Sequence, residues 1–153
     1  RMVSDMYSAV KKANPNVLFG ISPQGNIDNN YSFMYADVRK WCSQSGYLDY
    51  IIPQVYFGFK NQWCPFEDTV KKWSDMVTNE NVKIIYGLGI YNLGTNTEFT
   101  YDTRIFARQI EACMKLSNYD GIALYRYDSC FNPASNLSTQ TNNEISQIKE
   151  VLK

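Results

Sequence analysis

The stretch Tyr50-Ile51-Ile52-Pro53-Gln54-Val55-Tyr56-Phe57 begins as an apolar run and ends in aromatic and polar residues. Three other runs share this pattern, at residues 17–23, 82–92 and 121–128, and a helix-like segment follows each of the four. Because helix-length crossovers separate the runs, we expect parallel strands that are buried on both faces. The sequence therefore predicts an α/β fold built from four parallel β/α units.

Apolar residues recur at helical spacing between the predicted strands. We expect helices at residues 4–13, with Ser4 as the cap, and at 33–42, 66–77, 103–116 and 144–152, and polar loops at 25–30, 92–100 and 130–142. This order fits either a doubly wound sheet or a piece of a (β/α)8 barrel. A dinucleotide site is not favoured, because Gly87-Leu88-Gly89 lacks a third glycine and lies within a predicted strand.

Composition narrows the functional classes. The chain has 153 residues, enough for one domain with a real core, and its 15 basic and 15 acidic side chains cancel. No global field therefore attracts nucleic acid or an anionic membrane, and no apolar stretch is long enough to span a bilayer. The chain has no histidine, which excludes Ser-His-Asp and Cys-His catalysis and histidine zinc sites.

The four cysteines show no metal-binding spacing, and we expect neither a metal nor an organic cofactor. Cys42 and Cys113 fall in helical patterns and are expected in the core. Cys64 and Cys130 fall in loops after strands, where they are either thiols or a disulfide. The sequence leaves that choice open.

Polar and aromatic residues gather at the carboxyl ends of the predicted strands, the edge where β/α proteins bind ligands. Period-two alternation puts Gln54 and Tyr56 on one face, and it turns Tyr125 and Tyr127 inward while Ile122 and Leu124 face the helices. Hydroxyls, amides and rings suit a neutral polar ligand such as a sugar. The expected substrate-binding residues are Ser22, Gln54, Tyr56, Tyr91, Tyr127 and Trp63. The alternative is that the inward residues fill the interior and that Trp63 covers a rim.

The expected role of each carboxylate depends on whether it precedes or follows its predicted strand. Asp49 and Asp120 precede their strands, at the face where polar residues usually serve stability. Asp28, Glu98 and Asp128 follow strands, and Asp128 is the candidate catalytic acid or base. We expect Asp28 and Glu98 to be solvated loop residues. Glycoside hydrolysis requires two carboxyl groups.

Two segments, Phe19-Gly20-Ile21-Ser22-Pro23-Gln24-Gly25 and Asp49-Tyr50-Ile51-Ile52-Pro53-Gln54-Val55-Tyr56, resemble the signature of the glycosyl hydrolase-like 10 family. Gly87-Leu88-Gly89-Ile90-Tyr91 and Gly121-Ile122-Ala123-Leu124-Tyr125-Arg126-Tyr127 resemble its later strands. The resemblance implies a TIM barrel and a carbohydrate-active protein, extracytoplasmic (secreted or anchored at the cell surface) in bacteria. It also marks five pocket-lining positions, which are Ser22, Gln54, Tyr56, Tyr91 and Tyr127.

By order, the four strands resemble strands five to eight of that barrel, and the family's acidic Asp-Asp-Tyr segment has no counterpart here. Residues 1–153 are therefore expected to be a single partial domain, the C-terminal half of the barrel. The first residue, Arg1, also leads us to expect that sequence precedes it. A half barrel exposes two strand edges, so its expected partners are the missing N-terminal half or a second copy of the chain.

The leading hypothesis is a glycoside hydrolase-like protein that acts on a polysaccharide or glycan through carboxylate acid/base chemistry. Part of its site would lie upstream, so this chain alone is expected to be inactive. The alternative is a non-catalytic glycan-binding module. A third and weaker option is a small doubly wound domain that binds an unrelated polar ligand.

Overall fold

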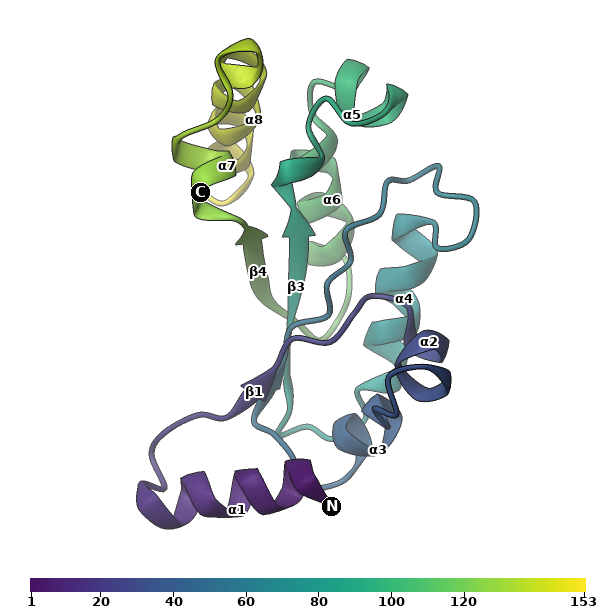
Figure 1. Ribbon diagram of the computed structural model, residues 1–153, viewed down its shortest axis with the longest axis vertical. Coiled ribbons are helices and arrows are strands. Elements are labelled where there is room, and N and C mark those ends of the chain that lie inside the picture. Colours follow the sequence, from purple (N-terminus) through teal and green to yellow (C-terminus); the bar gives the residue numbers. More distant parts are fainter.

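The computed structural model describes residues 1–153 and contains a single sheet of four parallel strands in chain order (Figure 1). The strands are β1 (Gly20–Ile21), β2 (Tyr50–Ile51), β3 (Lys83–Gly89) and β4 (Tyr119–Tyr125). The expected parallel order of four β/α units is confirmed. The sheet is open, with β1 and β4 as its edges.

Strands β1 and β2 are shorter than the apolar runs that contain them. Pro23 and Pro53 lie within these runs, and proline has no N–H to donate to a neighbouring strand. Regular pairing therefore stops before each proline and resumes as isolated bridges that join Gln24 to Gln54 and Gln54 to Gly87. The backbone thus keeps its parallel course as far as the polar residues at the strand ends.

Eight α-helices and two short 3₁₀ helices (η1 and η2) complete the fold. The elements are α1 (Met2–Ala13), α2 (Ile27–Ser32), α3 (Val38–Ser43), α4 (Phe66–Met76), η1 (Ile90–Asn92), α5 (Thr97–Tyr101), α6 (Ile105–Met114), α7 (Tyr127–Phe131), η2 (Ser135–Leu137) and α8 (Ser138–Val151). None of them is long and apolar enough to cross a membrane.

Several expected helix boundaries were wrong, some of them because of side-chain caps. Asn26 accepts a hydrogen bond from the N–H of Asn29 (3.0 Å) and starts α2 inside the predicted polar loop. Asp37 accepts from the N–H of Lys40 (3.1 Å), so the next helix begins at Val38 instead of residue 33. Helix α5 falls in the predicted loop at 92–100 except for its last residue, α7 runs from the end of the predicted strand at 121–128 to the start of the predicted loop at 130–142, and α8 begins six residues before the expected start at 144.

The core lies between the sheet and the helices on one of its faces. Helices α3, α4, α6 and α8 contact one another in chain order. Ile84, Tyr86 and Leu88 of β3 are fully buried against this layer, and the hydroxyl of Tyr86 donates to the carbonyl oxygen of Val70 in α4 (3.3 Å). Ile122 and Leu124 of β4 pack against the same core, as the alternation predicted. The residues between them therefore occupy the opposite face of the sheet.

Helix α1 lies at the amino ends of the strands (Figure 1). The carboxylate of Asp49 receives Lys11 Nζ from this helix (2.7 Å) and the N–H of Phe19 (2.7 Å), with the Tyr7 hydroxyl at 3.3 Å. Burial favours a higher pKa for Asp49, but these hydrogen bonds and the Lys11 charge outweigh it and lower the pKa. Asp49 is structural, as expected, and ties α1 to the sheet.

None of the four cysteines forms a disulfide bond in this structure. Cys42 and Cys113 are fully buried in the core, as predicted, and burial raises the pKa of each thiol to about 12. Cys64 is partly exposed and Cys130 is buried, and both are free thiols here. Of the two alternatives left open for Cys64 and Cys130, the structure has the thiols.

Candidate functional site

Three tyrosines cluster at the carboxyl ends of β2, β3 and β4. The rings of Tyr56 and Tyr125 are stacked, with centroids 5.7 Å apart and planes at 17°. Tyr91 meets both edge-on, at 5.7 Å from Tyr56 and 6.0 Å from Tyr125. None of the three hydroxyls takes part in a hydrogen bond within the chain, and Tyr91 and Tyr125 are exposed. The cluster therefore presents aromatic surface together with unused hydroxyl groups.

The amide of Gln54 lies on the same face of the sheet. Its Nε2 donates to the carbonyl oxygen (3.0 Å) and the hydroxyl (3.3 Å) of Ser22, which is exposed at the end of β1. The shared face with Tyr56 is the one that period-two alternation predicted. Ser22 and Gln54 thus join the three tyrosines along the carboxyl ends of all four strands. We call these five residues, Ser22, Gln54, Tyr56, Tyr91 and Tyr125, the tyrosine face.

Gly89 and Asn92 position this face, and neither was expected. A Cβ at Gly89 would lie 3.0 Å from Tyr56 Cγ and 3.0 Å from Tyr91 Cε1, so glycine leaves room for both rings over β3. The Asn92 amide donates to the carbonyl oxygen of Tyr56 (3.0 Å). The sequence signal for the first effect is the pair of glycines at 87 and 89, which share a strand face and leave it free of side chains.

The hydroxyl of Tyr56 remains protonated across the physiological range. Burial raises its pKa to about 12, and the neighbouring phenols of Tyr91 and Tyr125 add to this effect. The group therefore acts as a hydrogen-bond donor and acceptor rather than as a base. Such a hydroxyl suits the recognition of a neutral polar ligand.

Asp128 lies in the first turn of α7, just after β4. It lines a cavity of about 190 Å³ that also contains Tyr91 and Arg126. The structure thus brings the candidate acid and one member of the tyrosine face to the same cavity. The carboxylate of Asp128 has no hydrogen bond or ion pair within the chain, and no other carboxylate lines this cavity.

Two predicted binding residues lie away from the tyrosine face. Strand β4 ends at Tyr125, so Tyr127 is not the strand residue that the alternation assumed. It begins α7, is exposed, and packs its ring against Phe131 of the same helix (4.8 Å between centroids). Trp63 is also exposed and lines a separate cavity beside α2 and α4. The expectation that Tyr127 points inward from a strand was therefore wrong.

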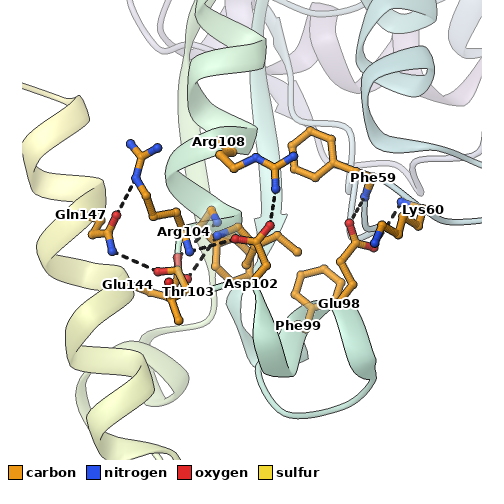
Figure 2. A network of polar contacts seen from close by, with 12 residues as sticks. Phe59, Lys60, Glu98, Phe99, Asp102, Thr103, Arg104, Arg108, Glu144 and Gln147 are labelled. Carbon is orange, nitrogen blue, oxygen red and sulfur yellow. Dashed lines mark hydrogen bonds and ion pairs between the residues drawn. The ribbon is translucent and has the colours of Figure 1, made fainter.

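The other loop carboxylates have structural partners. Glu98 of α5 accepts hydrogen bonds from the N–H groups of Phe59 (2.7 Å) and Lys60 (3.2 Å), which holds the loop after β2 against α5 (Figure 2). Asp28 pairs with Arg39 at 3.1 Å on the surface. Asp28 is thus an exposed residue, as expected, whereas Glu98 was wrongly expected to be merely solvated. No group of three acidic or cysteine side chains is arranged to hold a metal ion.

A model of the glycosyl hydrolase-like 10 family matches residues 1–103. The chain belongs to the glycosyl hydrolase-like 10 family. Within this member of the family, the matched residues include Ser22, Gln54, Tyr56 and Tyr91, whereas Tyr125 and Asp128 lie beyond them.

Curated relatives of this family member carry related names. A protein named glycosyl hydrolase DigH from Escherichia coli O6:H1 is 27% identical over 153 aligned positions, which cover 87% of this chain and 35% of that protein. A protein named glycosyl hydrolase YngK from Bacillus subtilis is 31% identical over 126 positions, which cover 72% of this chain and 24% of that protein. The chain therefore spans about a third or less of the length of these relatives.

Proposed function

We propose that the tyrosine face binds a glycan and that the intact protein is a glycoside hydrolase that works through carboxylate acid/base chemistry. The observation that carries this proposal is the set of three clustered tyrosines whose hydroxyls have no partner in the chain. Aromatic rings offer an apolar surface to sugar C–H groups, and the hydroxyls beside them bind sugar oxygens. The family name and the names of the relatives support the same ligand class.

The same proposal includes the arrangement of this chain as half of a barrel in the intact protein. An open sheet of four parallel strands, with helices on one face and ligand groups on the other, has the layout of half a (β/α)8 barrel. We propose that residues 1–153 form one partial domain and that further strands of the intact protein cover the tyrosine face and both sheet edges. A second copy of the chain is the alternative cover. We also propose an extracytoplasmic location, which rests on the family alone.

Asp128 is the candidate acid or base that this chain supplies. Its carboxylate is free and lies at one cavity with Tyr91. Hydrolysis of a glycosidic bond needs a second carboxyl group roughly 5 to 10 Å away. That cavity has no second one, so we propose that the partner carboxylate comes from the remainder of the intact protein. No step of this chemistry requires a metal or an organic cofactor.

Asp128→Asn in the intact protein tests the proposal. We expect glycan binding to persist and hydrolysis to fall at least a hundredfold, the usual size of a general acid or base contribution. If the variant keeps both glycan binding and hydrolysis, Asp128 has no role in the mechanism. Glycan binding without hydrolysis in the wild-type protein would favour the alternative function, a non-catalytic glycan-binding module, for which the lone carboxylate in the cavity is the supporting observation.

A further inference from the structure

A second cavity, of about 410 Å³, opens among the helices that cover the sheet. It lies between α2, α3, α4 and the loop that follows β2, and none of the five residues of the tyrosine face lines it. Its polar and aromatic lining includes Asn26, Asp28, Arg39, Trp63, Lys72 and Asp75. We call it the Trp63 cavity.

The backbone at Trp63 is fixed by a hydrogen bond, although the residue is 83% exposed. The side-chain oxygen of Asn61 accepts hydrogen bonds from the N–H groups of Trp63 (3.0 Å) and Cys64 (2.8 Å). Asn26, which also lines the cavity, donates to Cys64 Sγ (3.4 Å) and links this loop to the start of α2. Tryptophan is highly buried on average, so an exposed indole on a fixed loop suggests a platform for a ligand.

The charges around the Trp63 cavity balance. Asp28 pairs with Arg39 at 3.1 Å, and Asp75 pairs with Lys71 at 2.7 Å. Lys72 has no ion pair within the chain, so its ammonium remains available as a donor. Two carboxylates and two cationic groups line the cavity together, which gives many donors and acceptors without a net field for an anion. This lining matches a neutral ligand rich in hydroxyl groups.

The backbone connects this cavity to the tyrosine face over a short distance. Gly25 lines the cavity and is three positions after Ser22, with only two residues between them, so their Cα atoms lie within about 11 Å of each other. Between them, Gln24 forms a bridge with Gln54. A Cβ at Gly25 would lie 2.5 Å from the carbonyl oxygen of Gln54, so glycine allows this close passage. A single oligosaccharide is long enough to contact both places.

We propose that the Trp63 cavity is a further subsite for a neutral glycan whose other end occupies the tyrosine face. The ligand class rests on the proposed function, whereas the place of the subsite rests on the cavity itself. In this arrangement the indole of Trp63 stacks on one sugar ring, and the charged side chains around it bind the hydroxyls of that ring. Affinity therefore increases when the glycan becomes long enough to reach Trp63.

Calorimetry on the intact protein tests the subsite with neutral chito- and cello-oligosaccharides, from disaccharides to hexasaccharides. We expect wild-type affinity to rise with length and Trp63→Ala to remove this rise, about tenfold for the longest member, while short members bind unchanged. Trp63→Tyr should restore part of the loss. Phe33→Ala, at an exposed aromatic outside the cavity, is the matched control.

The outcomes separate this inference from the proposed function. If Trp63→Ala keeps the full dependence on length, the subsite is absent although the protein still binds glycans. If no oligosaccharide binds the wild-type protein and the indole N–H resonance of Trp63 does not move during titration, both proposals fail. If that resonance moves while Tyr125→Ala has no effect on affinity, the cavity binds sugar independently and the link to the tyrosine face is overturned.

Discussion

The ring of Tyr56 stacks on that of Tyr125, although β3 lies between the strands that carry them. This contact is possible because Gly89 of β3, which pairs with Tyr125, has no side chain to separate the rings. At Gly89, strand β3 therefore leaves space for the rings of Tyr56 and Tyr125 from its two neighbours, and Tyr91 follows just after the end of β3. The result is a compact aromatic cluster at the carboxyl end of the sheet, with two rings stacked and Tyr91 edge-on to both.

Removal of one ring of this pair should weaken glycan binding. Tyr125→Ala deletes the stacked partner of Tyr56, and a partner of this kind contributes about 0.5–1.5 kcal/mol. We expect a stability loss of no more than about this amount, because Tyr125 is half exposed, and a roughly two- to tenfold fall in oligosaccharide affinity, because the sugar loses one aromatic contact. Titration calorimetry measures the change, with Tyr101→Ala, an exposed tyrosine outside the cluster, as the control. Equal affinities for Tyr125→Ala and wild type would contradict the site.

A methyl group added at Gly89 should displace the rings of Tyr56 and Tyr91 while every side chain of the tyrosine face is kept. The new Cβ of Gly89→Ala would lie 3.0 Å from atoms of both Tyr56 and Tyr91, so the rings must shift. We expect a stability loss of about 1–3 kcal/mol, the usual cost of overpacking. Ring-proton chemical shifts of the two tyrosines should also change. Lys83→Ala, at the exposed start of β3, should leave those shifts as they are.

Strand positions and faces could be predicted from the sequence because they depend on local periodicity. The apolar runs and the crossover lengths predicted the parallel order, and alternation placed Gln54 and Tyr56 on one face. Alternation failed at Tyr127 because β4 ends at Tyr125 and a helix follows. The end of a strand depends on its neighbours, which a single run of residues does not reveal.

Long-range contacts explain why the expectations for Glu98 and Trp63 differ from the structure. Glu98 looked like a solvated loop residue, yet it binds backbone N–H groups about forty positions earlier in the chain. Trp63 was grouped with the tyrosines because its loop follows a strand, but the loop turns toward α2 and α4 instead. Both outcomes depend on how loops pack against distant elements. Residue type and spacing carry no signal for them.

Loss of the Glu98 carboxylate should loosen the loop after β2 (Figure 2). In Glu98→Ala, the N–H groups of Phe59 and Lys60 lose their acceptor, which typically costs about 1–3 kcal/mol. We expect faster hydrogen exchange at these two amides and a lower unfolding midpoint in urea. Glu80→Ala, at an exposed carboxylate without a partner, provides the control. Unchanged exchange at Phe59 and Lys60 would show that Glu98 does not hold the loop.

Glu144 of α8 should make stability depend on pH. Its buried carboxylate accepts hydrogen bonds from the N–H groups of Ile105 and Phe106, each at 3.2 Å, at the start of α6 (Figure 2). Burial raises its pKa above the ordinary 4.5, and Asp102 adds to the rise, whereas the two N–H groups and Arg104 oppose it. The net direction is upward because desolvation of the charge is the largest of these effects.

The sign of the effect follows from proton binding. Between pH 4.5 and the raised pKa, the folded state holds the Glu144 proton more often than the unfolded state does. The free energy of unfolding contributed by this group therefore decreases as pH rises through that window. Glu144→Gln keeps an acceptor for one N–H but cannot titrate. Urea unfolding at about pH 4 and about pH 7 should show a smaller decrease for the variant than for wild type. Parallel pH profiles for the two proteins would mean that Glu144 has the same pKa in both states.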